Sequence, residues 1–108
     1  MSGGGGGSGW VPDVQVDCSR LLETTILNSP VSAVVSTLAR HDVLPVELRD
    51  QSGKKILVAT KGGQIAGSLT PISLPNIIRC IEEGWKFVAV VTEVTGGRCV
   101  VKVRPEAA

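Results

Sequence analysis

The stretch "GGQIAGSLTP" (residues 62–71) has the glycine spacing of a phosphate-binding loop, with four residues between Gly62 and Gly67 and a serine directly after. A Walker A loop needs a lysine after the second glycine, then a serine or threonine, and a helix N-terminus that holds the phosphates. Here Ser68 stands in place of the lysine and Leu69 in place of the hydroxyl residue. We therefore interpret residues 62–63 as a turn. Gly67, inside a predicted strand, indicates a bulge or the close approach of another backbone or a ligand.

His41 stands beside Asp42, and this pair raises the question of catalysis. Adjacent residues do not face each other on a helix, and no serine or cysteine nucleophile stands at a recognisable spacing. The end of a predicted helix is where a histidine interacts favourably with the helix dipole. The glutamates stand alone in predicted strands or lie at a solvated helix end. The sequence thus predicts no catalytic residue and a protein that is not an enzyme.

The three cysteines, Cys18, Cys80 and Cys99, are widely spaced. This pattern is typical neither of a disulfide framework nor of a C-x-x-C metal or redox motif, and with His41 it lacks the close ligand pair of a zinc site. We interpret the cysteines as buried thiols in a reducing compartment, and we expect no metal and no cofactor. No leader pattern and no apolar run of membrane-spanning length is present, so we expect a cytoplasmic protein without a membrane partner.

Positive charge gathers on the last predicted strand, "RCVVKVR". Alternation along a strand places Arg98, Lys102 and Arg104 on one face, where they could contact phosphates. Three further cations at predicted hairpins would widen this face into a patch: Lys54, Lys55 and Lys61. The alternative is an ordinary solvated strand face. Because the net charge of the chain is only +1, any binding of nucleic acid depends on such a local patch.

Aromatic residues are scarce, at 3% of the chain. Binders of single strands stack bases on aromatic rings, and only Trp85 and Phe87 could serve in this way. Trp10 follows a glycine-rich segment and is expected either to anchor that segment on the domain or to stay exposed for a partner. Trp10 and Trp85 are therefore candidate partner-binding residues.

The elements that position these residues follow from the period of the apolar pattern. Residues 1–9 are a flexible Gly/Ser-rich tail, residues 10–19 an extended arm, and residues 20–105 a single globular domain. Strands are expected at 20–27, 44–50, 54–61, 64–69, 85–94 and 98–104, and helices at 30–41 and 70–83. The order β-α-β-β-β-α-β-β predicts an α+β domain whose five or six strands form a strongly curled antiparallel sheet or a small β-barrel with two helices.

Two stretches carry a resemblance to a known family: "PVELRDQSGKKILVATKGGQIAGSL", a strand pair with a glycine-turned strand, and "LPNIIRCIEEGWKFVAVVTEV", a helix, a glycine and a long strand. In this pattern residues 44–103 resemble the HIRAN domain, a small β-barrel module of DNA-repair helicases that also stands alone in bacteria and phages. Most signature residues of that family are missing here, including the tyrosine that it uses against a DNA end. The resemblance therefore implies the barrel more than DNA-end binding.

The sequence favours a non-catalytic binding module that contacts the nucleic-acid backbone through the basic strand face. The alternative is a protein-protein or self-association module that uses exposed, valine-rich strand edges. A third possibility is an unrecognised small enzyme or nucleotide binder.

Overall fold

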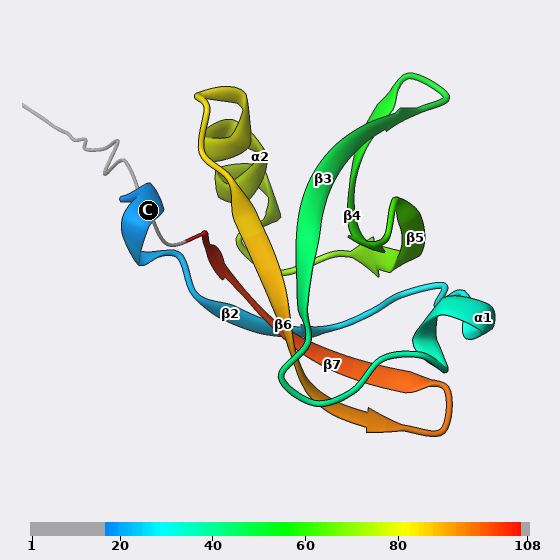
Figure 1. Cartoon of the computed structure of the whole chain (residues 1–108). Coiled ribbons are helices and arrows are strands. Elements are labelled where there is room, and N and C mark those ends of the chain that lie inside the picture. Colours follow the sequence, from blue (N-terminus) through cyan, green and yellow to red (C-terminus); the bar gives the residue numbers. More distant parts are fainter. Residues whose placement is uncertain (1–16, 107–108) are drawn as a thin grey trace, which may run out of the picture.

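The chain builds one antiparallel sheet of six strands that curls around a core of aliphatic side chains (Figure 1). The computed structural model describes residues 17–106. The strands lie in the order β2-β7-β6-β3-β4-β5, and the predicted α+β element order is confirmed. The elements are η2 (Cys18–Arg20), β2 (Glu23–Ile26), α1 (Ser32–Val35), β3 (Val43–Gln51), β4 (Lys54–Lys61), β5 (Gln64–Leu69), α2 (Leu74–Glu82), β6 (Phe87–Thr95) and β7 (Arg98–Pro105).

The hairpins predicted from turn residues form between β3 and β4, β4 and β5, and β6 and β7. The turn before β5 shows why glycine is needed there. Gly62 and Gly63 have φ angles of 59° and 81°, a left-handed conformation that side chains disfavour, and Lys61 pairs with Gln64 across them. These two glycines are thus a hairpin turn, as the sequence predicts.

Gly67 lies where the chain that leaves β2 passes over β5. A Cβ atom at Gly67 would lie 3.0 Å from the Asn28 carbonyl oxygen and 3.1 Å from Leu27 Cβ. Asn28 and Ser68 exchange backbone hydrogen bonds of 2.8 and 2.9 Å at this crossing. The pairing of β5 with β4 shifts register beside Gly67, because Ala59 pairs with Gly67 and Thr60 with Ile65, so Ala66 is an extra residue on β5. Both features predicted for Gly67, a bulge and a close backbone approach, are therefore present.

The crossing also brings the two edges of the sheet together at one place. Besides the Asn28–Ser68 bridge, the N–H of Val31 donates to the carbonyl of Ala66 on β5. These contacts do not close the sheet, which remains a strongly curled, open sheet of six strands.

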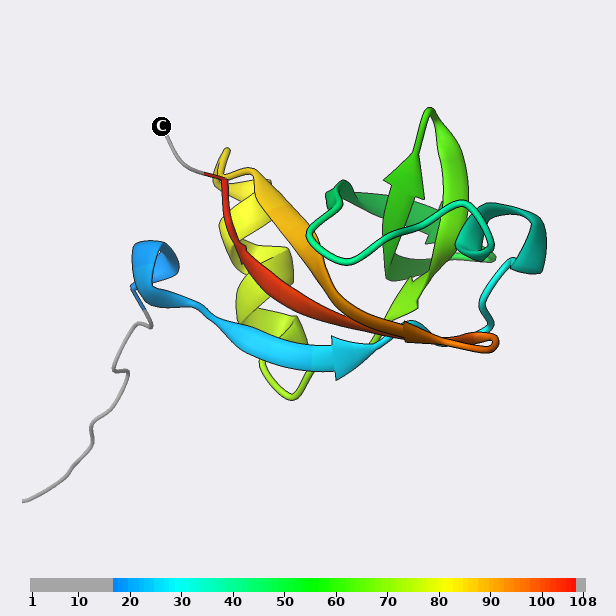
Figure 2. The same ribbon diagram turned by 60° about the horizontal axis from the view of Figure 1, so that its bottom comes forward.

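The longer helix, α2, lies on the inner side of the sheet, behind β2, β7 and β6 in Figure 2. Its buried residues Ile77 and Cys80 join the core cluster formed by the inward side chains of the strands. Pro75 stands in its first turn and Gly84, at φ 107°, follows its end, as predicted. The outer side of β6 and β7 is left without a covering helix (Figure 1).

The helix predicted over residues 30–41 is wrong in length, because only Ser32–Val35 is helical. The expected cap, Ser29, has a φ of 47° and does not start the helix, which has no side-chain cap. Just past the last turn, the hydroxyls of Ser36 and Thr37 donate to backbone carbonyls of the helix at 3.2 and 2.7 Å. Serine and threonine that bond locally to the backbone disfavour continued helix.

The arm predicted for residues 10–19 is only partly described. Its last residues, with Arg20, form the 3-10 turn η2 rather than an extended strand, because the side chain of Asp17 accepts a 3.0 Å hydrogen bond from the N–H of Ser19. Trp10, the rest of the arm and the predicted tail lie outside the described residues. Within residues 17–106, no helix is long and apolar enough to cross a membrane.

Candidate functional site

The alternation of buried and outward residues predicted for the last strand is confirmed. Along β7 the side chains of Cys99, Val101 and Val103 are buried in the core, whereas Lys102 is exposed on the opposite side. Lys102 is paired with Val90 of β6 and Arg104 with Val88, so both cations stand beside apolar residues of the neighbouring strand. We call this outer side of the two strands the β6–β7 face; its residues are Lys86, Val88, Val90, Val100, Lys102 and Arg104, of which Val88 is buried.

The basic residues of the chain separate into two groups by their ion pairs. All eleven lie within residues 17–106. Six of them pair with a carboxylate: Arg20, Arg49, Lys55, Lys61, Arg79 and Arg98. The others have no carboxylate within ion-pair distance in the described part of the chain, and they are Arg40, Lys54, Lys86, Lys102 and Arg104. Four of these five lie on or beside the β6–β7 face, and only Lys54 lies elsewhere.

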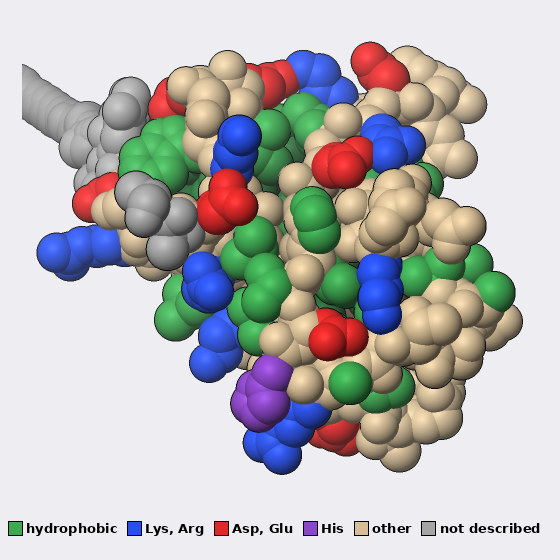
Figure 3. All heavy atoms as spheres, in the orientation of Figure 1, with side chains coloured by type: hydrophobic (Ala, Val, Ile, Leu, Met, Phe, Trp, Pro, Cys, Tyr) green, Lys and Arg blue, Asp and Glu red, His purple; other side chains and the backbone are tan. Residues whose placement is uncertain are grey.

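Lys102 and Arg104 of β7 line a groove of about 300 Å³ together with Arg40, which lies in the turn before β3. We call it the basic groove. It is lined by Arg40, His41, Val90, Val91, Thr92, Lys102 and Arg104. Figure 3 shows basic side chains gathered beside the histidine at the lower left of the molecule. The groove thus brings four cationic or titratable side chains around one space.

A backbone ladder positions the turn that carries Arg40 and His41. The N–H of His41 donates to the Val91 carbonyl, and the N–H of Val91 donates to the Asp42 carbonyl, both at 2.8 Å. These bonds extend the β3–β6 pairing, which begins at Val43 and Val90, by one step. Sequence reasoning missed Arg40 and Lys86, and it placed His41 at a helix end. The residues that pair here are some fifty positions apart in the sequence, and the only local signal was two adjacent basic side chains.

Lys86 borders a second hollow at the other end of the β6–β7 face, about 500 Å³ in volume. Val43, Pro45 and Val88 give it an apolar lining, and Glu106 stands beside Lys86 at its margin. The N–H of Glu106 donates to the Lys86 carbonyl at 2.8 Å, which continues the pairing of β6 with β7. The basic surface therefore borders an apolar one.

The hairpin lysines do not widen the basic strand face, and that prediction is wrong. Lys55 pairs with Glu82 of α2; this hydrogen bond and the attraction of the carboxylate raise the pKa of Lys55. Lys61 donates to the Thr37 carbonyl at 2.9 Å. Lys54 lies at the tip of the β3–β4 hairpin, which projects away from β6 (Figure 1). The reason is that β3 pairs with β6 only through Val46 and then diverges.

The other predicted binding residues do not line the basic groove. Arg98 lies at the far end of β7, where its guanidinium is 3.8 Å from the Glu93 carboxylate. Phe87 is buried in the core, so no base can stack on it, whereas Trp85 is 40% exposed just before β6. In the glycine stretch, the Ser68 N–H is already used by Asn28, and its amide cannot hold a phosphate.

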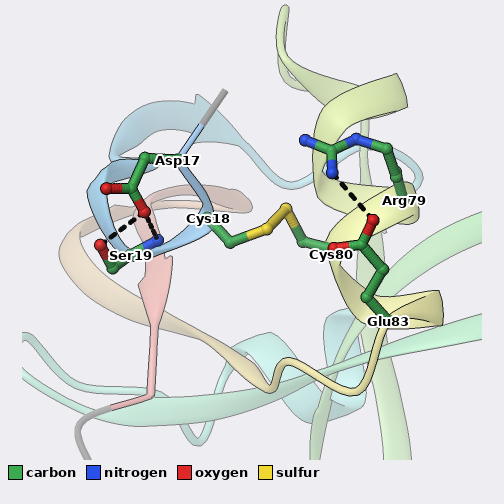
Figure 4. The surroundings of a disulfide bond; sticks show 6 residues. All are labelled: Asp17, Cys18, Ser19, Arg79, Cys80 and Glu83. Carbon is green, nitrogen blue, oxygen red and sulfur yellow. Dashed lines mark hydrogen bonds and ion pairs between the residues drawn. A yellow bond between two sulfur atoms is a disulfide. The ribbon is translucent and has the colours of Figure 1, made fainter. Parts of the chain in front are cut away.

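The prediction of three free thiols is wrong, because Cys18 and Cys80 form a disulfide (Figure 4). Their separation of 62 residues gave no sign of it, and the contact arises because α2 packs against η2. Cys99 is free and buried, and burial raises the pKa of its thiol. Disulfides persist mainly in oxidising compartments, so the cysteines no longer indicate a reducing compartment and do not favour the predicted cytoplasmic location. Among residues 17–106, no cluster of three or more His, Cys, Asp and Glu could hold a metal ion.

No protein-family model matches the chain, and no curated protein or solved structure is significantly similar to it. The resemblance to the HIRAN domain stays a prediction that these comparisons leave untested.

Proposed function

We propose that the protein is a non-catalytic binding module that contacts the phosphate backbone of nucleic acid through the β6–β7 face. One observation carries this proposal: of the five cations without a carboxylate partner in residues 17–106, four lie on or beside this face. Like charges that share a surface repel one another, and a polyanion removes that repulsion and releases counterions. Arg98 extends the same side of β7, and its exposed ion pair with Glu93 is of the weak kind that a phosphate can replace.

The surface fits the backbone better than the bases. Of the aromatic residues in the described chain, Phe87 is buried and Trp85 lies just outside the strands. Base recognition by stacking needs exposed rings, whereas phosphate contacts need only placed cations. We therefore expect binding that depends strongly on salt and little on sequence.

The test is fluorescence anisotropy of a labelled duplex of about 20 base pairs, titrated at several salt concentrations starting near about 50 mM. The substitution Lys102→Gln removes a cation at the centre of the face. We expect it to weaken binding by about 3- to 10-fold at low salt and to lower the slope of log affinity against log salt by about one. Lys54→Gln is the matched control, because Lys54 also has no described carboxylate partner but lies at a hairpin tip. If the wild-type protein shows no binding at this salt concentration, the proposal is wrong.

Self-association is the second candidate, and it is favoured by the edge strand β2. Leu22, directly before this strand, is 61% exposed, and Ile26, its last residue, is 39% exposed. An edge strand has unpaired backbone N–H and C=O groups, and exposed apolar side chains beside them favour pairing with another chain. Sedimentation velocity over a range of concentrations decides the matter, since a monomer that persists at every concentration removes this candidate.

A further inference from the structure

The cationic and titratable residues of the basic groove come from two separate parts of the chain. Lys102 and Arg104 belong to β7, while Arg40 and His41 belong to the turn Ala39–Asp42. Asp42 closes this turn twice: its N–H donates to the Ala39 carbonyl at 3.0 Å, and its carboxylate accepts the Ala39 N–H at 2.9 Å. With the turn also bonded to Val91, Arg40 and His41 are carried at a fixed place on the sheet.

The backbone at His41 has a φ of 79°, a conformation that is uncommon for residues other than glycine, although asparagine, aspartate and histidine adopt it more readily than the rest. A strained residue of this kind persists where the surroundings determine it, and such residues cluster at functional sites. Here the strained position directs an imidazole into the lining of the groove.

The charges in the groove are available to a ligand. Within residues 17–106, the side chains of Arg40 and Lys102 have no hydrogen-bond or ion-pair partner, and the Arg104 guanidinium donates only to the Pro105 carbonyl, at 3.1 Å. The neighbouring acid, Asp42, is turned to Ala39 and to Lys61, whose Nζ lies 3.8 Å away. Arginine, lysine and histidine donors around one space suit the oxygens of a phosphate group. The volume of the groove is several times the share of one liquid water, about 30 Å³, so a phosphate group fits.

We propose that the basic groove holds one phosphate group of the bound nucleic-acid backbone, and that Arg40 and His41 bind its oxygens together with Lys102 and Arg104. This inference rests on the proposed function and adds the turn Ala39–Asp42 to the interface. The same chemistry would accept a small phosphate compound, so the test has two arms.

The first arm adds inorganic pyrophosphate to the ¹⁵N-labelled full chain and follows backbone amide shifts by NMR. We expect saturable shifts concentrated at residues 40–42, 90–92 and 102–104, and their loss in Arg40→Gln. The second arm repeats the duplex titration with Arg40→Gln, with His41→Asn, which suits the positive φ, and with the control Lys54→Gln. We expect Arg40→Gln to weaken duplex binding by about 3- to 10-fold and to lower the salt slope by about one, and the control to change affinity less than about 2-fold. Thermal unfolding confirms that each variant is folded.

The possible results distinguish a failure of the groove inference from a failure of the proposed function. If Lys102→Gln weakens duplex binding but Arg40→Gln and His41→Asn bind like the wild type, the groove inference is overturned and the proposed function stands. If the duplex does not bind but pyrophosphate shifts the groove residues, the nucleic-acid source of the phosphate is wrong, and the groove is a site for a small phosphate compound. If pyrophosphate causes no localised shifts and the duplex does not bind, both proposals are wrong.

Discussion

At the scale of single residues, Gly67 is the described glycine with the least room for a side chain. A Cβ atom there would meet the Asn28 carbonyl at 3.0 Å and Leu27 Cβ at 3.1 Å, and both are held by the pairing of Asn28 with Ser68. Because backbone atoms cannot yield as a flexible side chain can, we expect Gly67→Ala to lower the free energy of unfolding by about 1–3 kcal/mol. Urea unfolding followed by tryptophan fluorescence measures this loss.

Gly97 offers a matched control for that substitution. It lies in the β6–β7 hairpin, and a Cβ atom there would meet nothing within 4 Å. We expect Gly97→Ala to change the free energy of unfolding by no more than about 0.5 kcal/mol. Equal losses in the two variants would show that the crossing at Gly67 does not constrain the fold.

The residue scale also shows what a sequence can reveal about a site. Arg98, Lys102 and Arg104 were predicted to share a face because alternation along a strand is a local rule. Arg40 and His41 were missed as groove residues because their position depends on hydrogen bonds to Val91, far away in the sequence. No local pattern contains that distance, so a groove formed between separate elements is known only from the fold.

At the scale of elements, the carboxylate of Glu23 links the edge strand β2 to the start of α2. It accepts the N–H of Ser73 at 3.0 Å and also the N–H of Ile72, just before the first turn of the helix. Burial by itself would raise the pKa of Glu23, but the hydrogen bonds from Ser73 and Ile72 outweigh it and the pKa is lowered. A negative charge at a helix N-terminus is also favourable to the helix dipole.

We expect Glu23→Gln to lower the free energy of unfolding at neutral pH by about 1 kcal/mol, because a neutral amide accepts these hydrogen bonds more weakly. A lowered pKa in the folded state means that ionised Glu23 stabilises the protein above the pKa of the unfolded chain. This contribution is lost as the pH falls through the folded pKa. The difference between wild type and variant should therefore shrink in acid, as measured by urea unfolding from pH 7 to pH 3.

Glu106→Gln is the control, because the carboxylate of Glu106 has no hydrogen bond or ion pair within residues 17–106. It should unfold like the wild type at each pH. A Glu23→Gln variant whose destabilisation does not change with pH would contradict a role for the negative charge.

Elements differed in how well they could be predicted. The hairpins and α2 were predicted because turn glycines, strand alternation and a proline in the first helical turn all act locally. The helix over residues 30–41 was overestimated because Val31, Val34, Val35 and Leu38 have helical spacing, yet Ser36 and Thr37 bond back to the backbone after one turn. The apolar pattern was read correctly in part, since Val34, Val35 and Leu38 are buried and Val31 is not.

At the scale of the whole molecule, the Cys18–Cys80 disulfide fixes the beginning of the described chain to α2. It spans 62 residues of sequence, and β2, α1, β3, β4 and β5 lie between its two ends. A cross-link that closes so long a loop restricts the unfolded chain, and disulfides of this kind stabilise by about 2–4 kcal/mol. It supports a small domain whose core contains few aromatic side chains.

Two measurements test this bond. In denaturant without a reductant, a thiol reagent should detect only Cys99, and after reduction it should detect all three cysteines. In the folded protein Cys99 should react slowly near neutral pH, because burial raises the pKa of its thiol and shields the sulfur.

The double substitution Cys18→Ala and Cys80→Ala should lower the free energy of unfolding by about 2–4 kcal/mol, and the wild type in reductant should approach the same value. Cys99→Ala removes only a buried thiol, so its stability should still fall when the reductant is added. Three reactive thiols in the unreduced protein would show that the bond is absent, and the segment before β2 would then be held to α2 by packing alone.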